Sequence, residues 1–337
     1  MSDQHEPVLA RRQAPGRSFK RLPVTRLASG ADLSLGLHVL TGRKEGPTLG
    51  ILTTVHGDET MPVLAVRKLF ESVNPDKLAG RLAAIPVANP LAVTAFSRQT
   101  PEQHGKTDLH EVFPGSPKGN VTQRLAHTIT KHLLDHVDAL VDIHSGGLGG
   151  RLQSRADLDA SASPDIFERA LKLCRAFGAD FIHSNDLAGT AARYCNGRGV
   201  PTVNPEIGGV YLGVEAESAY VEACVEGLRS IMIELGMLDE APRPLKRQLL
   251  YTVKSRFESN PSLGGYLKSF YGLPSDLGRR VSKGEKLAEV IDLHSFEVIE
   301  ELTAAVDGYL FFSRYSGVVD AGTKAFAIAE ESTSQWL

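Results

Sequence analysis

Cysteine is scarce in this chain. Only Cys174, Cys195 and Cys224 occur among its 337 residues, and no pair has the C-x-x-C spacing. This odd, sparse count argues against a disulfide framework and suits reduced thiols in the cytoplasm. No apolar run approaches the ~20 residues that span a bilayer. The first residues also lack the charged-then-apolar order of a signal peptide. We therefore expect a cytoplasmic protein that does not enter a membrane.

An excess of either charge sign is also absent. The formal net charge is −3, whereas a general nucleic-acid binder normally carries a strong basic excess. Residues Arg11 to Arg26 are basic, but this stretch contains Pro and Gly and has no helical periodicity. We expect residues 1–32 to form a solvated arm lying on the body of the protein.

Alternating strand and helix patterns follow from residue 33 to residue 241. Apolar runs predict strands at Leu33–Leu40, Leu49–Val55, Leu82–Val87, Ala139–Ile143, Phe181–Ile182 and Gly199–Asn204. Stripes of period 3.6 predict helices at Asp58–Val73, Val121–His136, 164–178 and Val214–Leu235. Such alternation indicates an α/β domain whose sheet is mixed in direction. Residues 91–120 hold many turn formers and predict a long functional loop.

The pattern changes after Pro242-Arg-Pro244. Short alternating runs separated by glycines follow at Leu249–Val253, Lys286–Ile291, Tyr309–Phe312 and Ala325–Ala329. Residues 242–337 therefore predict a small all-β module, a barrel or a sandwich. It contains no cluster of metal-type side chains, so a role as a lid or oligomerisation surface is expected.

The segment His56-Gly57-Asp58-Glu59 lies where a predicted strand passes into a helix. It offers an imidazole and a carboxylate three residues apart. His144, at the end of another predicted strand, is the best third candidate. Open α/β sheets bind ligands in the crevice beyond their strand ends, and three protein ligands plus one open position make a catalytic zinc site. His56, Glu59 and His144 are therefore candidate metal ligands.

At this point the chain resembles the succinylglutamate desuccinylase/aspartoacylase family of zinc carboxypeptidase-like hydrolases. The resemblance rests on five motifs, in the family's order, between about residues 45 and 215. They are His56-Gly-Asp-Glu59, Asn89-Pro90, Asp108-Leu-His-Glu-Val-Phe-Pro-Gly115, Asp142-Ile-His-Ser145 and Pro205-Glu-Ile-Gly-Gly209. It implies a mixed-sheet zinc carboxypeptidase-like domain with helices on both faces, and the β-rich C-terminal module resembles one found in many members.

The resemblance also implies roles for individual residues. One Zn²⁺ per chain would be bound by the three candidate ligands. Glu206 would be the general base that takes a proton from the attacking water and passes it to the leaving amine. Asp108 would orient His56, and Arg98 would polarise the scissile carbonyl.

One family motif is altered in this chain. The family normally has Asp-x-Asn-Arg before its Phe-Pro-Gly, and the Asn-Arg pair grips the substrate carboxylate, whereas this chain has His110 and Glu111 there. A carboxylate would repel an anion that an arginine fork would bind. The pocket could therefore accept a neutral or cationic group, or the ancestral activity could be lost. A third alternative is that another arginine takes over, with Arg151, Arg155, Arg193 and Arg198 as the candidates. We predict His110, Glu111 and Arg198 as the substrate-binding residues.

These observations predict a zinc-dependent deacylase of a small N-acylated amino acid or amine. We expect no nucleic-acid partner and no membrane partner. The sequence is compatible with a homo-oligomer. A metallocarboxypeptidase acting on peptides or cell-wall fragments is the nearest alternative, and a zinc-binding protein without catalysis is another. A serine hydrolase is disfavoured because Ser145 lacks the Gly-x-Ser-x-Gly elbow.

Overall fold

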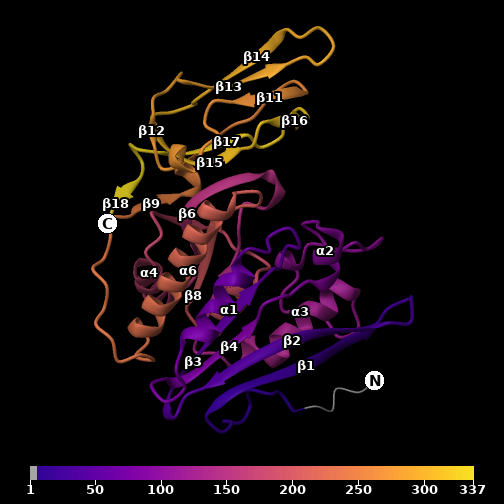
Figure 1. Ribbon diagram of the computed structural model, residues 1–337, viewed down its shortest axis with the longest axis vertical. Helices are drawn as coiled ribbons and strands as arrows, with labels where there is room; N and C mark the ends of the chain where they lie inside the picture. The colour runs from indigo at the N-terminus through magenta and orange to yellow at the C-terminus, as the bar shows by residue number, and fades with distance from the viewer. Residues whose placement is uncertain (1–5) are drawn as a thin grey trace.

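A long mixed β-sheet runs through the computed structural model, which describes residues 6–337 (Figure 1). Its strands follow the order β1-β2-β4-β3-β5-β8-β6-β15-β17-β10. The first part of the sheet comprises β1 (Gly16–Arg26), β2 (Asp32–Thr41), β3 (Lys44–Thr53), β4 (Ala79–Ile85), β5 (Ala139–Ile143), β6 (Gly150–Asp159), β7 (Phe181–Asn185) and β8 (Thr202–Gly208). The expectation about a signal peptide falls largely on residues 1–5, which lie outside the described part.

Helices cover both faces of this sheet because each face is apolar. One core packs the sheet against α1 (Pro62–Ser72), α4 (Pro164–Phe177) and α6 (Val214–Glu234). A second core, on the other face, includes residues of α3 (Val121–His132) and α5 (Ala191–Asn196). The predicted α/β class with a mixed sheet and helices on both faces is confirmed. None of the helices in residues 6–337 has the length and apolar character to cross a membrane.

The parallel strands β3, β5 and β8 place their carboxyl ends at one edge of the sheet. Register pairs Thr53 of β3 with Ile143 of β5, and Val141 of β5 with Val203 of β8. Residues directly after β3 and β5 therefore emerge side by side, which is where open α/β sheets form their sites. The predicted loop 91–120 lies beyond this edge and holds the short helix α2 (Pro90–Ala95) and a single 3₁₀ turn (Leu109–Glu111).

The expectation of a solvated N-terminal arm is wrong for residues 16–26. They form the edge strand β1, which pairs with β2 from Gly16 opposite Thr41 to Arg26 opposite Asp32. Leu22 is buried in the second core, while Lys20 and Arg21 stay exposed. The basic side chains interrupt the apolar alternation from which a strand is predicted. Charged residues are nevertheless common on edge strands, because they discourage pairing with strands of other molecules.

Strand β6 was not predicted at all. Its buried positions include Arg155, Asp157 and Asp159 as well as Leu152 and Leu158. Charges at buried positions break the apolar alternation on which strand prediction depends. Strand β8 also extends past the predicted end at Asn204 and carries Glu206 within it.

The C-terminal module is built from two layers of strands. A four-stranded sheet of β14 (Val298–Thr303), β13 (Lys286–Ile291), β11 (Gly265–Ser269) and β16 (Gly317–Val319) forms one layer. The other contains β10 (Arg256–Ser259), β12 (Arg280–Val281), β15 (Gly308–Arg314) and β17 (Phe326–Glu330). A common apolar core with Leu267, Leu310 and Ile328 lies between them, as expected for a sandwich.

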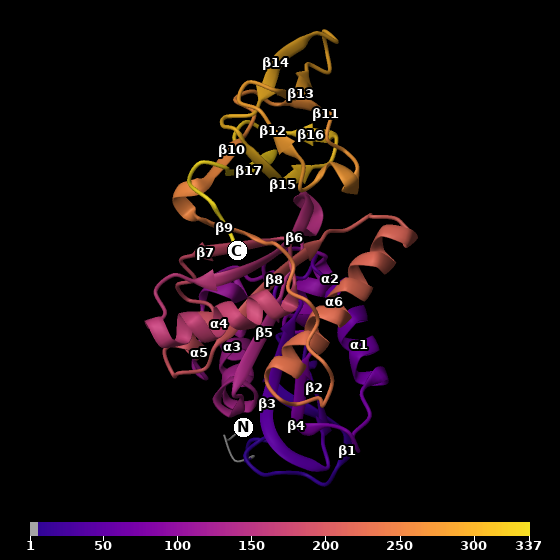
Figure 2. The ribbon, with the colours of Figure 1, turned by 90° about the vertical axis from the view of Figure 1, so that its left-hand side faces the viewer.

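This module is joined to the rest of the protein through backbone hydrogen bonding. Strand β15 pairs antiparallel with β6. Strand β9 (Leu249–Thr252) pairs parallel with β7 and antiparallel with β18 (Gln335–Trp336). Figure 2 shows the module stacked beyond β6 and β9, at the end of the molecule opposite β1. Strand β6, which follows His144 in the chain, thus pairs with β8 of the α/β domain and with β15 of the C-terminal module.

Replacing Leu22 tests whether β1 is an integral strand. Because Leu22 is buried, we expect Leu22→Ala to lower the free energy of unfolding by about 2 kcal/mol or more. Lys20→Ala, on the same strand but exposed, should change it by less than about 0.5 kcal/mol. Urea denaturation of the two variants measures both values, and equal, small effects would restore the solvated-arm interpretation.

Candidate functional site

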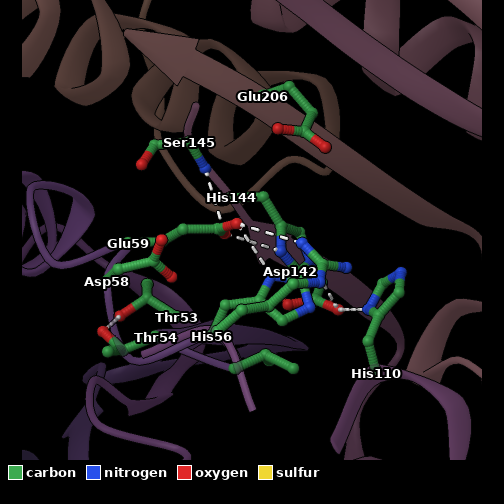
Figure 3. A network of polar contacts seen from close by, with 12 residues as sticks. Thr53, Thr54, His56, Asp58, Glu59, His110, Asp142, His144, Ser145 and Glu206 are labelled. Carbon is green, nitrogen blue, oxygen red and sulfur yellow. Dashed lines mark hydrogen bonds and ion pairs between the residues drawn. The ribbon is translucent and has the colours of Figure 1, made fainter. Parts of the chain in front are cut away.

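The carboxylate of Glu59 lies between two imidazoles at the edge of the sheet (Figure 3). His56 Nδ1 is 2.8 Å from Glu59 Oε1, and His144 Nδ1 is 3.1 Å from Glu59 Oε2. The backbone N–H of Ser145 also donates to Oε2, at 3.2 Å. All three side chains are buried. The structure therefore brings together the three residues that the sequence singled out as candidate ligands.

Local backbone geometry delivers these side chains to one place. His144 follows β5 directly, and His56 follows the end of β3 by three residues. In between, Thr54 has a φ of 55°, which is unusual for a β-branched residue. Its hydroxyl donates a hydrogen bond to the carbonyl of Pro86 at 2.9 Å, which holds the turn. The strained turn directs His56 toward the crevice rather than onward with the strand.

Each imidazole has an acid behind its other ring nitrogen. Asp108 Oδ1 lies 3.3 Å from His56 Nε2, and Asp142 Oδ2 lies 3.3 Å from His144 Nε2. Acids in this position favour the tautomer whose Nδ1 lone pair points away from them, and this arrangement is usual for metal-binding histidines. Burial works against ionisation of Asp108, but His56 and Arg98 hold its pKa well below the usual range.

The donor set fits a divalent metal. Tetrahedral zinc with ligands at 2.0–2.2 Å requires donor atoms roughly 3.3 Å apart. Each Nδ1 lies near that separation from one oxygen of Glu59, His56 at 2.8 Å from Oε1 and His144 at 3.1 Å from Oε2. Two imidazoles and one carboxylate also match the ligand types of catalytic zinc sites. The side chains of His56, Glu59 and His144 could therefore hold such an ion.

His110 adds a third imidazole to the cluster. Its ring centre lies 5.4 Å from that of His56 and 4.7 Å from that of His144. One nitrogen from each of the three rings lies within 4.8 Å of the others, so this trio is a second possible donor set. Glu59 contacts His56 and His144 at 2.8 and 3.1 Å, so the described residues offer two overlapping donor sets, one with Glu59 and one with His110. Burial lowers the pKa of His110 to about 3, with the charge of His144 adding to the effect, so His110 is a neutral ring.

Arg98 lies at the rim of the cluster and is half exposed. Its Nε donates to Asp108 Oδ2 at 3.1 Å, and its Nη1 lies 3.7 Å from Glu59 Oε1. The guanidinium thus faces the same space as the Glu59 carboxylate. A fixed cation at this position can stabilise negative charge that develops on a carbonyl oxygen.

Glu206 stands on β8 beside His144, and the two residues form a β-bridge. In Figure 3 its carboxylate is directed toward the imidazoles. Burial raises the pKa of Glu206, whereas the charges of Arg155 and His144 oppose that rise. A carboxylate with these opposing influences is suited to accepting and releasing a proton.

The structure separates the remaining candidates. Glu111 is exposed one position beyond His110. Arg198 does not reach the cluster: its Nη2 lies 3.6 Å from Asp135, ahead of β5, whereas His144 follows the other end of that strand. The arginine that does reach Glu206 is Arg155, whose Nη2 is 3.3 Å from Glu206 Oε1. Sequence reasoning gave Asp142 no role, although it is the only charge in an apolar strand.

Comparisons with known proteins show which family the chain resembles. The model of the succinylglutamate desuccinylase/aspartoacylase catalytic domain matches residues 45–233. The N-alpha-acetyl-L-2,4-diaminobutyric acid deacetylase of Halomonas elongata is 28% identical over 324 residues, which are 93% of this chain and 90% of that protein.

Two solved structures share the whole architecture. A succinylglutamate desuccinylase from a Silicibacter species has a TM-score of 0.85 at 23% identity, covering 98% of this chain and 99% of its own. The product-bound ectoine utilization protein EutE (DoeB) from Ruegeria pomeroyi has a TM-score of 0.82 at 24% identity, covering 97% of this chain and 100% of its own. Both likenesses show the shared fold.

The neutral state of His110 gives a measurable pH dependence in metal-free protein. Below its ordinary pKa of 6.5 the unfolded imidazole takes up a proton, whereas the folded one does so only near pH 3. Stability should therefore fall as the pH falls from 6.5, by at most about 1.4 kcal/mol per pH unit from this residue. We expect His110→Asn to show a shallower decline than the parent in chemical denaturation between pH 6.5 and 4.5. His104→Asn, at an exposed position, serves as the control, and parallel curves for parent and His110→Asn would contradict the assignment.

Proposed function

The chain belongs to the succinylglutamate desuccinylase/aspartoacylase family, and on this basis we propose that it is a zinc-dependent hydrolase that removes the acyl group from a small N-acylated amino acid or amine. Family membership and the deacetylase relative support a hydrolase of amide bonds. The observation that carries the more specific proposal is the Glu59 carboxylate between His56 and His144, with Glu206 on the neighbouring strand. The three cysteines, all unpaired and buried, favour a cytoplasmic location.

His56, Glu59 and His144 would hold one zinc ion per chain. Asp108 and Asp142 would keep the two imidazoles in the tautomer that presents Nδ1 to it. When bound, zinc supplies Lewis acidity to the attacking water and to the acyl carbonyl. Because both imidazoles and the carboxylate are buried, their positions are already defined by packing.

Glu206 and Arg98 would perform the remaining chemistry. The Glu206 carboxylate takes the proton from the attacking water as its oxygen bonds to the acyl carbon. The same carboxyl group then gives that proton to the leaving nitrogen as the C–N bond breaks. Arg98, at the rim, stabilises the negative charge on the carbonyl oxygen during this step.

The loop at His110 and Glu111 provides the basis for a substrate class. The relative from Halomonas elongata is named for an N-acetylated diamino acid, which carries an additional amine. The exposed carboxylate of Glu111 stands where the family's arginine is expected, so it would attract a cation and repel an acidic side chain. We propose an N-acyl diamino acid or N-acyl polyamine as the substrate. This loop disfavours a metallocarboxypeptidase, which needs an anion clamp.

Metal analysis combined with hydrolysis assays tests the proposal. We expect about one zinc per chain in the purified protein and acyl release from N-acetylated diamino acids. Glu206→Gln should retain the metal but lose at least about 100-fold in kcat, because only the proton shuttle is removed. His144→Ala should lose the metal as well as the activity.

The outcomes separate the alternatives. Bound zinc without turnover of any N-acyl compound would favour a non-catalytic zinc protein. Cleavage of peptides in preference to acylated amines would favour a carboxypeptidase. A Glu206→Gln variant with full activity would remove Glu206 from the mechanism.

Restoring the family's pair of residues tests the substrate class separately. We expect the His110→Asn, Glu111→Arg double variant to shift kcat/KM toward N-acetylaspartate, relative to an N-acetyl diamino acid, by at least about tenfold, since an arginine fork pairs with a carboxylate. Glu297→Arg, at an exposed position on the β13–β14 hairpin, introduces the same charge change as a control. An unchanged ratio in the double variant would show that this loop does not select the substrate.

A further inference from the structure

Three residues on adjacent strands form a row across the sheet at the site. His144, after β5, bridges to Glu206 on β8, and Glu206 stands opposite Arg155 on the antiparallel strand β6. Residues directly opposite each other on neighbouring strands place their side chains on the same face of the sheet. Glu206 is therefore flanked by a proposed metal ligand on one side and by a guanidinium on the other.

The position of Arg155 is defined by several contacts. Its Nε and Nη2 donate to the two oxygens of Asp157, at 2.5 and 3.1 Å. The same Nη2 lies 3.3 Å from Glu206 Oε1, and the guanidinium stands 5.5 Å from the centre of the Phe311 ring. Arg155 is 5% exposed. A two-pronged contact of this kind leaves a guanidinium little freedom to move.

A second row of residues contacts Asp157 on the side away from Glu206's strand, through β7 and β9. Tyr251 of β9, His183 of β7 and Asp157 of β6 stand opposite one another in register. The ring of Tyr251 stacks on that of His183 at 4.5 Å, and His183 Nδ1 is 3.4 Å from Asp157. Tyr251 and Phe311 both belong to the C-terminal part of the chain. The module thus forms the wall against which Arg155 is held.

The buried charges of Arg155, Asp157 and Glu206 are poorly explained as a source of folding stability. Removing one cation and two carboxylates from water is costly, and apolar residues of similar size generally stabilise a core as well or better. Apolar packing is available on this side of β6, because Leu152 belongs to the same buried apolar cluster as Tyr251 and Phe311. Ala156 and Leu158 face the core on the other side of the sheet. Arg155 is the charged residue of β6 that stands opposite Glu206, and Asp157, opposite Asn204, binds Arg155. This placement points to a role at the site.

Taking the proposed function as its basis, we propose that Arg155 is a positioning residue that holds the carboxylate of the general base Glu206 in its working orientation. The N–H of Arg155 engages Oε1, which leaves Oε2 as the oxygen that receives the proton from water and releases it to the departing amine. Without this contact, Glu206 could rotate away from the attacking water. Asp157 acts one step further back, by fixing Arg155.

Kinetics of Arg155→Met test the proposal. We expect kcat on an N-acetyl diamino acid to fall about 100-fold, as for a reacting group displaced by about 1 Å, with KM changed less than about threefold and zinc content unchanged. Arg155→Lys keeps the charge but not the fork, so it should recover part of the lost kcat. A rise in KM with kcat preserved would overturn the proposal and make Arg155 a substrate-binding residue.

The matched control is Arg256→Met. Arg256 also stands over Phe311, at 5.9 Å, and pairs with Glu258 instead of Glu206. Its removal should change kcat by less than about twofold. A loss equal to that of Arg155→Met would show that any cation beside Phe311 matters only structurally, and would overturn the proposal.

A double-variant cycle asks whether Arg155 acts through Glu206. In a Glu206→Gln background the further change Arg155→Met should lower kcat by less than about threefold, because the group that it orients is already gone. A full 100-fold further loss would overturn the proposal, since Arg155 would then act by another route.

Crystal structures of the zinc-loaded parent and of Arg155→Met provide a readout that needs no turnover. We expect the same fold and metal ligands, with the Glu206 carboxylate moved by about 1 Å or more or split between rotamers. An unmoved carboxylate would overturn the inference. If the parent cleaves no N-acyl compound, the proposed function fails, and the crystallographic comparison still decides whether Arg155 holds Glu206.

Discussion

The arrangement of this molecule depends on one constraint: two imidazole nitrogens must approach the same carboxylate at about 3 Å. Glu59 meets that constraint with His56 and His144, which come from the ends of different strands. The parallel pairing of β3 with β5 sets the distance between those ends. The strained turn at Thr54 and the acids at Asp108 and Asp142 then orient the rings. Sheet, turn and acids all act on the same few atoms.

The sequence predicted the part of the site that is local. His56, Glu59 and His144 are recognisable because each follows an apolar strand and because their side chains are typical metal ligands. Arg155 was only one of four candidate arginines, and β6 itself was not predicted. Its contact with Glu206 arises from the antiparallel register of two strands some fifty residues apart, and nothing in the local pattern encodes that register. Arg198 was the arginine that the sequence favoured for substrate binding, yet it lies at the other end of β5.

The same physical reason explains the fold predictions. The strands and helices with clear apolar periodicity were predicted to within a few residues. The strands with charges at key positions, β1 and β6, were not. In β1 the charges face water along an edge, whereas in β6 they are buried and paired. Hydrophobic patterns therefore predict strands with apolar faces well and strands that carry functional charges poorly. Buried charges depend on partners that lie far away in the chain.

The hydrogen bonding of β15 to β6 and of β9 to β7 has an evolutionary consequence. A segment attached only by a flexible tether can be exchanged between genes by recombination at the tether. Here an exchanged C-terminal segment would also have to supply strands that match two existing edges, together with the aromatic rings that Arg155 and His183 contact. The two regions are consequently expected to diverge together along a lineage, as one inherited unit.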